Sequence, residues 1–308
     1  MYATIGPEAL GIRGLSLSEA IALARDARFA GLAFDIRLAA NAVAERGLEA
    51  VREEFSRAGV RPAHWNLPVV WRDDAAWEAD LRELPRLAAV GRELGAPRTA
   101  TYMPSGSDER AYEANFEWHV ARLRPIAEVL HDAGCRFGIE YIGPRTFRAA
   151  FRHEFIHTLD GLMELIAAIG VDTVGVMLDS WHLFASGGSL ADLDHLGNED
   201  VVVVHVNDAP AGIAWDDQID TVRALPMETG VINLAGFMQA LQRLGYDGPV
   251  MPEPFSQRVN DLAETDPLAA AREAARAMDG LWQAAGLGRE SGVGGRRSEA
   301  TTRRFKAT

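Results

Sequence analysis

The amino-acid sequence predicts one α/β domain folded as a (β/α)8 barrel, a closed cylinder of eight parallel strands surrounded by helices. Strand-like and helix-like segments alternate along almost the whole chain, which is typical of parallel βαβ construction. The chain has 308 residues, and a barrel of this kind takes about 250. No Gly-x-Gly-x-x-Gly loop joins a strand-like segment to a helix-like one, so the sequence does not favour a dinucleotide-binding sheet.

The predicted strands are short and mostly apolar runs. In chain order they lie at residues 3–6, 31–35, 60–65, 98–102, 137–140, 174–179, 201–205 and 248–252. The first is weak and the other seven are clear. This number fits an eightfold barrel better than an open, doubly wound sheet.

Helix-like segments separate these strands. We expect helices at residues 16–29, 38–58, 74–94, 109–133, 159–169, 190–196, 234–244 and 267–285. Ser16 or Ser18 is placed to cap the first helix. Several of the helices are followed by the glycine that a left-handed C-cap requires, namely Gly59, Gly95, Gly134, Gly170 and Gly245.

The sequence divides into a catalytic domain and a tail. Residues 1–285 carry the alternating pattern and are expected to form the barrel. Residues 286–308 are rich in glycine, serine, threonine and arginine and contain few apolar residues. That composition is typical of a disordered tail, and it favours a solvated segment over a nucleic-acid-binding arm.

Composition limits the partners and the compartment. The formal net charge of −13 argues against binding to nucleic acid, which needs a concentrated basic surface. Cys135 is the single cysteine, so no internal disulfide is possible and the reducing cytoplasm is the expected location. The chain shows no signal-peptide pattern and no apolar run of about 18 residues, so we expect no membrane partner.

Four metal-compatible side chains follow four different predicted strands. Glu140, Asp179, His205 and Glu253 are separated by 39, 26 and 48 residues, spacings close to one or more strand–helix repeats. The carboxyl ends of the strands meet on one face of a barrel, so these side chains should lie together. Three carboxylates and an imidazole at one point would repel each other strongly without a cation, and a divalent metal ion is the simplest explanation for such a group. We expect manganese, although magnesium, cobalt and zinc accept the same ligands.

Residues beside these ligands are candidates for binding or orienting groups. His182 lies three positions after Asp179 and could bind a substrate oxygen or orient a ligand, or it could only pack or cap. Asn207 and Asp208 follow His205 and could orient its ring.

Further candidates lie in the predicted loops and strand ends. Residues 208–230 form a 23-residue connection, which is long enough to indicate a functional loop. Arg223 in this loop could grip a substrate oxygen or pair with a nearby aspartate. His64, Trp65 and Trp181 could line a sugar pocket, although tryptophans at such positions can also serve packing alone.

These segments resemble the xylose-isomerase-like TIM-barrel superfamily, often described as sugar phosphate isomerases/epimerases. The resemblance is carried by the stretches 138–144, 178–182, 204–208 and 245–255, and it is clearest between about residues 135 and 275. Inosose isomerases are the most similar group and ketose 3-epimerases follow. The resemblance implies that Glu140, Asp179, His205 and Glu253 bind the metal, that both glutamates act as acid and base, and that His182 contacts substrate. One departure is the stretch 226–230, which replaces the usual Pro-Gly-x-Gly turn and contains Glu228.

The residues and the resemblance together predict a metal-dependent isomerase or epimerase of a keto-sugar or keto-cyclitol. Proton abstraction beside the carbonyl would give an enediolate. The alternative is a lyase that uses the same first step and then eliminates a β-substituent, like inosose dehydratases or C-glycoside deglycosidases. The latter type works with a small partner subunit, and a homo-oligomer is also possible. An apurinic endonuclease and a non-catalytic sugar-binding barrel are less favoured, because the chain is acidic and carries both glutamates.

Overall fold

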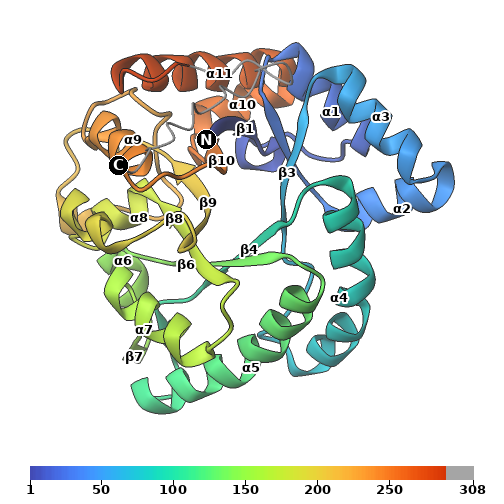
Figure 1. Ribbon diagram of the computed structural model, residues 1–308. Helices are drawn as coiled ribbons and strands as arrows, with labels where there is room; N and C mark the ends of the chain where they lie inside the picture. The colour runs from blue at the N-terminus through green and yellow to red at the C-terminus, as the bar shows by residue number, and fades with distance from the viewer. Residues whose placement is uncertain (289–308) are drawn as a thin grey trace, which may run out of the picture.

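The computed structural model describes residues 1–288 and contains the closed eight-stranded barrel that the sequence predicts (Figure 1). Around the cylinder the strands follow the order β1-β10-β9-β8-β6-β4-β3-β2, and every neighbouring pair is parallel. The weak first strand is real, because β1 (Tyr2–Ile5) pairs with both β10 and β2 and so closes the ring. Most of the expected tail, residues 289–308, lies outside the described residues.

The remaining elements follow the alternating order of the prediction. The barrel strands are β2 (Gly31–Phe34), β3 (Arg61–Asn66), β4 (Arg98–Met103), β6 (Arg136–Tyr141), β8 (Val174–Asp179), β9 (Val201–Val206) and β10 (Pro249–Pro252). The longer helices are α1 (Leu17–Asp26), α2 (Ile36–Arg46), α3 (Leu48–Ala58), α4 (Asp74–Leu94), α5 (Tyr112–Asp132), α7 (Leu159–Ile169), α9 (Leu234–Arg243), α10 (Gln257–Thr265) and α11 (Pro267–Ala284). The short elements are η1 (Pro7–Leu10), β5 (Gly106–Ser107), α6 (Arg145–Arg148), β7 (His153–Glu154), α8 (Ser180–Ala185), η2 (Leu190–His195) and η3 (Trp215–Asp217).

The structure corrects the prediction in two repeats. The segment 38–58 is not one helix, because Gly47 has φ 84° and ψ 153° and separates α2 from α3. The segment 190–196 is a 3-10 turn, η2, and the α-helix of this repeat is the short α8, which begins directly after Asp179. Both differences arise in connections, where helix-like composition does not by itself determine a continuous helix.

Apolar side chains fill the space between the strands and the surrounding helices. A second, smaller cluster joins the strands β4, β8 and β9 and contains Ala100, Met177, Val202 and Val203. Gly138 on β6 packs against this cluster, since a Cβ atom there would come within 3.3 Å of both Ala100 and Val202. Gly138 precedes Glu140 by two positions and therefore shares its face of the strand. The cluster thus forms an apolar floor below the carboxylate of Glu140.

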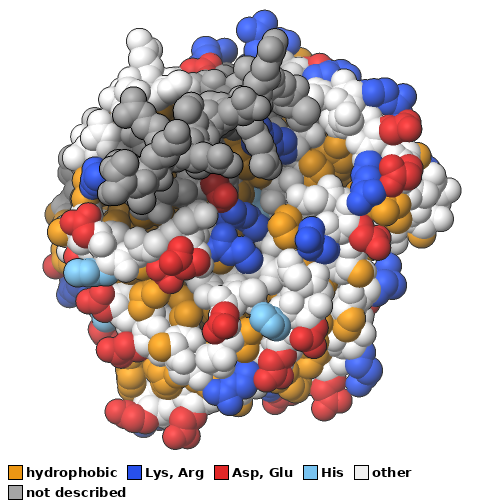
Figure 2. Space-filling model, viewed as in Figure 1, with side chains coloured by type: hydrophobic (Ala, Val, Ile, Leu, Met, Phe, Trp, Pro, Cys, Tyr) orange, Lys and Arg blue, Asp and Glu red, His pale blue; other side chains and the backbone are white. Residues whose placement is uncertain are grey.

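The outer surface is mixed in charge. Acidic and basic side chains are interspersed on the face seen in Figure 2, outside the area that the grey atoms cover. Among residues 1–288, no helix combines the length and apolar character needed to cross a bilayer.

Candidate metal centre

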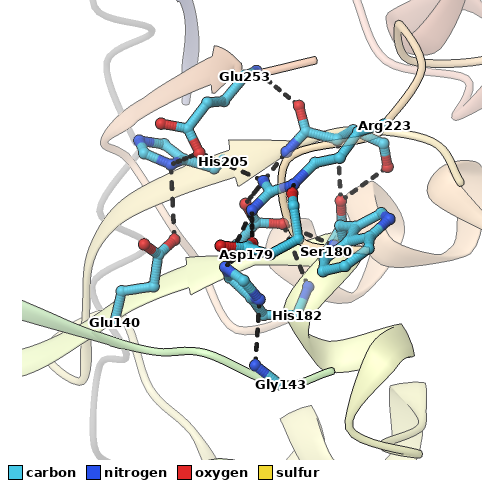
Figure 3. Close-up of polar contacts among 11 residues, drawn as sticks. Glu140, Gly143, Asp179, Ser180, His182, His205, Arg223 and Glu253 are labelled. Atoms are coloured by element: carbon cyan, nitrogen blue, oxygen red, sulfur yellow. Dashed lines mark hydrogen bonds and ion pairs between the residues drawn. The ribbon is translucent and has the colours of Figure 1, made fainter. Parts of the chain in front are cut away.

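The four predicted ligands meet at the carboxyl ends of their strands. Glu140, Asp179, His205 and Glu253 each offer one ligand atom, and these atoms all lie within 4.8 Å of one another. The strand register accounts for part of this arrangement, because His205 on β9 is the Cα partner of Asp179 on β8 and of Met251 on β10. Figure 3 shows the four side chains pointing toward a common centre.

Unpaired polar atoms in this centre fit a cation. Glu140 and His205 are buried, yet Glu140 Oε1 and His205 Nε2 have no hydrogen-bond partner within the described part of the chain. His205 Nδ1 lies 3.3 Å from Glu253 Oε2 and 3.6 Å from Glu140 Oε1. Buried polar atoms are seldom left without a partner, and a set of three carboxylates and one imidazole suits a divalent metal ion. The residues present therefore fit such an ion.

The charges at the centre perturb one another's ionisation. Burial, followed by the negative charges of Glu253 and Asp179, raises the pKa of Glu140 well above its usual value. Burial opposes protonation of His205, but Glu253 and Asp179 outweigh it and raise the pKa of the imidazole. Burial would raise the pKa of Glu253, yet His205 and Arg223 lower it overall. The centre therefore holds protons that a metal ion would displace.

Arg223 lies inside the centre, and protein groups surround its guanidinium. Its Nη1 donates to Asp179 Oδ2 at 2.8 Å and to Glu253 Oε2 at 3.3 Å. Its Nη2 donates to Asp220 Oδ1 at 2.8 Å and lies 3.1 Å from His182 Nε2. Its Nε donates to the backbone oxygen of Asp220 at 2.8 Å. A guanidinium has five N–H groups; four of them donate to oxygen atoms of Asp179, Glu253 and Asp220, and the fifth faces His182.

Of the two expected roles of Arg223, the structure shows the ion pair with a nearby aspartate. The pair is buried and not on the surface, and it includes Asp220 and two of the predicted ligands, Asp179 and Glu253. A contact with substrate stays a prediction.

The guanidinium of Arg223 also lies between the rings of Trp181 and Phe255, with 4.7 Å and 4.8 Å from its Cζ to the two ring centroids. Trp181 is fully buried beneath it. Trp181 therefore packs against Arg223 and does not line the cavity. This is the packing role that the sequence left open, and not the predicted place in the pocket wall.

His182 is held from two sides. The backbone N–H of Gly143 donates to His182 Nδ1 at 3.2 Å, and Arg223 approaches Nε2 (Figure 3). Burial and the neighbouring Arg223 lower the pKa of His182 to about 4, so the ring is neutral at pH 7. The structure thus places His182 against Arg223, and a substrate contact stays a prediction.

Asn207 orients ligands other than the one expected. Its Nδ2 donates to Asp179 Oδ2 at 3.1 Å, and its Oδ1 accepts from the backbone N–H of Glu253 at 2.6 Å. Asn207 therefore links the ends of β8 and β10, and no hydrogen bond of its side chain to His205 is found within residues 1–288. Its position two residues after a predicted ligand, on the same face of the strand, is the signal that could have identified this role.

Asp208 organises the long connection between β9 and α9. Its carboxylate accepts hydrogen bonds from the backbone N–H groups of Thr229, Gly230 and Ile232. Its own backbone pairs with Ala224 in both directions, which fixes the residue after Arg223. The expectation that Asp208 orients His205 is wrong, since its side chain serves the loop. Asp220, which bonds Arg223 from within this loop, was not identified from the sequence.

The two neighbouring candidates His64 and Trp65 have different surroundings in the structure. His64 is buried, lines a cavity beside the centre and lies with its ring centroid 6.3 Å from that of His205. Burial lowers the pKa of His64 to about 3, so it is neutral. Trp65 is fully buried on the opposite side of β3, where its Nε1 donates to Ala96 O at 3.0 Å. Trp65 therefore packs in the wall, and its predicted pocket role is corrected.

A cavity of about 560 Å³ opens beside the centre. His64, His205 and Glu253 lie on its wall at the strand ends, and the connections after β1, β2 and β3 form much of the rest. Glu228, in the stretch that departs from the resembling proteins, does not line it. Its carboxylate accepts from the backbone N–H of Leu225 and pairs with Arg258.

Comparison with known proteins matches the chain to one family model and to sugar and cyclitol isomerases and epimerases. The family model described as "Xylose isomerase-like TIM barrel" matches residues 20–281. The inosose isomerase of Halalkalibacterium halodurans is 22% identical over 232 residues, which is 73% of this chain and 78% of that protein. The ketose 3-epimerase of Arthrobacter globiformis is 24% identical over 229 residues, 73% of this chain and 70% of that protein.

Solved structures share the fold. A xylose isomerase domain protein from Alicyclobacillus acidocaldarius is 28% identical with a TM-score of 0.81, covering 93% of this chain and 99% of that one. The IolI protein with a bound zinc atom is 18% identical with a TM-score of 0.72, covering 92% and 98% of the two chains. At that identity the second likeness concerns the fold alone.

Proposed function

Because the chain belongs to the xylose isomerase-like TIM barrel family, we propose that it is a divalent-metal-dependent isomerase or epimerase of a keto-sugar or keto-cyclitol. The observation that carries this proposal is the convergence of Glu140, Asp179, His205 and Glu253 beside an open cavity. The matches to an inosose isomerase and a ketose 3-epimerase support the substrate class.

The four converging residues would hold the metal ion. When bound, a divalent cation stabilises the negative charge that develops on a substrate carbonyl oxygen, by several kcal/mol. Manganese is the metal we propose first, and the zinc atom of the IolI structure supports zinc as the next choice. The oxygen-rich ligand set accommodates either.

The two glutamates would move the proton. One carboxylate takes the proton from the carbon beside the carbonyl, the C–H electron pair becomes a C=C bond, and the carbonyl π pair moves onto oxygen. A proton returned by the other glutamate to the opposite face of the same carbon restores the carbonyl and gives the epimer. In the isomer, the hydroxyl on that carbon gives its proton to the former carbonyl oxygen and becomes the new carbonyl, and the abstracted proton returns to the former carbonyl carbon. General acid–base catalysis of this kind contributes roughly 10²- to 10⁴-fold.

Neighbouring residues would keep this machinery aligned. Asn207 holds Asp179 and the backbone of Glu253, and Arg223 holds the carboxylates of both. Arg223 also carries the positive charge that limits repulsion among the buried acids. His64, neutral and on the cavity wall, would be placed to bond a substrate hydroxyl.

Isotope exchange tests the proposal. Metal-loaded protein is incubated in deuterated water with a panel of keto-sugars and inososes, and the recovered compounds are analysed by mass spectrometry and NMR. We expect deuterium at the carbon beside the carbonyl. Glu140→Gln and Glu253→Gln should each lower the exchange rate by about 10²- to 10⁴-fold. Glu117→Gln, at an exposed glutamate on α5, is the matched control and should change nothing.

Two results would count against the proposal. Loss of water or of an aglycone from the substrate would assign the protein to the lyases, which share the first step. Absence of exchange with every compound in the panel, despite bound metal, would remove the enzymatic assignment to this substrate class.

A further inference from the structure

The cavity beside the metal centre extends well beyond the ligands. Its wall combines strand ends with three loops and the first turn of α2. The lining residues outside the strand ends include Pro7, Ile12, Leu15, Leu17, Leu38 and Pro68. The volume of about 560 Å³ falls in the range of about 300–1,000 Å³ that encloses drug-sized ligands. A single sugar ring has only about a dozen non-hydrogen atoms, so it would leave much of this space to water.

The end of the cavity beside the metal ligands is polar. His64, His205 and Glu253 lie there, and Asn66 follows on the same connection. A ring with a hydroxyl on nearly every carbon needs such partners, because a buried hydroxyl without a hydrogen bond is costly. This end therefore suits the sugar or cyclitol ring.

Several polar side chains in the rest of the wall are already engaged by the protein. Ser16 caps α1 through its reciprocal bonds with Glu19, and Asp35 caps α2 by accepting from two backbone N–H groups. Arg37 bonds to Asp80 and to the backbone oxygen of Pro68. These three groups contribute little hydrogen-bonding capacity to a ligand. Glu8 and Arg13 also line the cavity and are exposed, so the loop-lined part combines apolar side chains with two charged ones.

Leu38 is the clearest of these apolar side chains. It lies in the first turn of α2, lines the cavity and is 43% exposed. Ile12 and Leu15 come to the same cavity from the connection between β1 and α1. Because Ile12 is already buried, an apolar ligand group lying along these residues would remove chiefly the surface of Leu15 and Leu38 from water, which is favourable in proportion to the area covered.

We infer that the substrate is a keto-sugar or keto-cyclitol carrying an apolar substituent, with its ring at the metal centre and the substituent along Ile12, Leu15 and Leu38. This inference rests on the proposed function and makes its substrate class more specific. It assigns the loops after β1 and β2 to substrate selection, whereas the strand ends carry the chemistry.

A matched substrate series tests the inference. The series consists of 3-oxo-glucose, its methyl glycoside and its phenyl glycoside, each incubated with manganese-loaded protein in deuterated water. Because a single added methylene in an apolar pocket changes kcat/KM by about 10-fold or more, the phenyl member should exceed the methyl member by at least about tenfold. In Leu38→Asp this ratio should fall to near one. Val70→Asp replaces a 57% exposed apolar residue that does not line the cavity, and it should retain the ratio.

Measurements of binding and of turnover together distinguish a failure of the apolar-substituent inference from a failure of the isomerase proposal. Calorimetric titration of the same three compounds measures affinity whether or not they react. Equal affinities and equal rates for the methyl and phenyl members would overturn the inference and leave the isomerase proposal standing. Tight binding of the phenyl member with no exchange and no released phenol would support the cavity assignment and count against the isomerase proposal. An unchanged ratio in Leu38→Asp would also overturn the inference.

Discussion

Replacing Asn207 by alanine should weaken metal binding without removing any metal ligand. Asn207 is fully buried, donates to Asp179 Oδ2 at 3.1 Å and accepts from the backbone N–H of Glu253 at 2.6 Å. Its loss removes one of the hydrogen bonds that orient the Asp179 carboxylate and leaves the buried backbone N–H of Glu253 without its partner. A hydrogen bond to a charged group contributes about 1.5–3 kcal/mol.

The magnitude follows from the part that such residues take in metal sites. Partners that orient ligands typically contribute about 10- to 100-fold in metal affinity, which corresponds to about 1.4–2.7 kcal/mol. The dissociation constant for manganese, measured by calorimetry or by competition with a chelator, should rise by that factor in Asn207→Ala. Asp179 retains the hydrogen bonds from Arg223 and from the backbone N–H of Trp181, so the effect should stay below the loss of a ligand.

Asn198→Ala provides the matched control. Asn198 also accepts a backbone N–H bond, from Asp247 at 3.2 Å, but it lies before β9 at the opposite end of the barrel. Its replacement should leave metal affinity unchanged. The reasoning would be refuted by an Asn207→Ala protein that binds manganese within twofold of the original, or by an equal loss of affinity in Asn198→Ala.

Three further predictions follow from the same contacts. Metal affinity should fall as pH falls, because Glu140 and His205 have raised pKa values and a proton on either group must leave before the metal binds. Calorimetry in buffers of different ionisation enthalpy should detect the released protons. Metal binding without proton release at neutral pH would contradict the raised pKa values. Trp65→Ala should lower the free energy of unfolding by about 3–5 kcal/mol in denaturant titrations, as for a large core side chain, whereas a purely pocket-lining residue would affect KM and leave stability unchanged. Gly47→Ala should lower the free energy of unfolding by about 1–3 kcal/mol in the same titrations, because φ 84° with ψ 153° is strained for any residue with a Cβ atom. A Cβ at this position would meet no atom within 4 Å, so steric contact does not contribute to the loss. An unchanged denaturation midpoint would show that the backbone between α2 and α3 adjusts without cost.

The convergence of the four ligands was predictable because it depends on topology. In a parallel barrel every strand presents its carboxyl end to the same face, so a metal-compatible residue at a strand end has a known destination. Glu140, Asp179 and His205 lie within the last two residues of β6, β8 and β9, and Glu253 directly follows β10. The sequence contained this information in short local runs.

Roles that depend on side-chain direction were harder to predict. His64 and Trp65 are neighbours on β3, and successive side chains of a strand point to opposite faces, so only one of them can line the cavity. Which one does so depends on the register of the whole barrel. The structure places His64 on the cavity wall and Trp65 against α4, where a Cβ at Gly91 would come within 2.5 Å of Trp65 Nε1.

Contacts made by the long loop could not be predicted from the sequence for a different reason. Arg223 reaches Asp179, which is 44 positions away in the chain, through a connection without regular secondary structure over most of its length. No periodic pattern fixes the path of such a segment. The partner of Arg223 and the role of Asp220 follow only from the folded loop.

The pairing of Asp208 with Ala224 gives the long connection a stem that is independent of its tip. The two residues meet directly at the end of β9, and Arg223 is attached to the stem side of the segment. Residues 210–219 lie outside this pairing and dock on neighbouring elements, because Trp215 Nε1 donates to Phe184 O at 2.8 Å and Gln218 O accepts from Thr146 Oγ1 at 2.6 Å. The backbone pairing of Asp208 with Ala224 therefore anchors Arg223 at the metal centre separately from the contacts that hold residues 210–219.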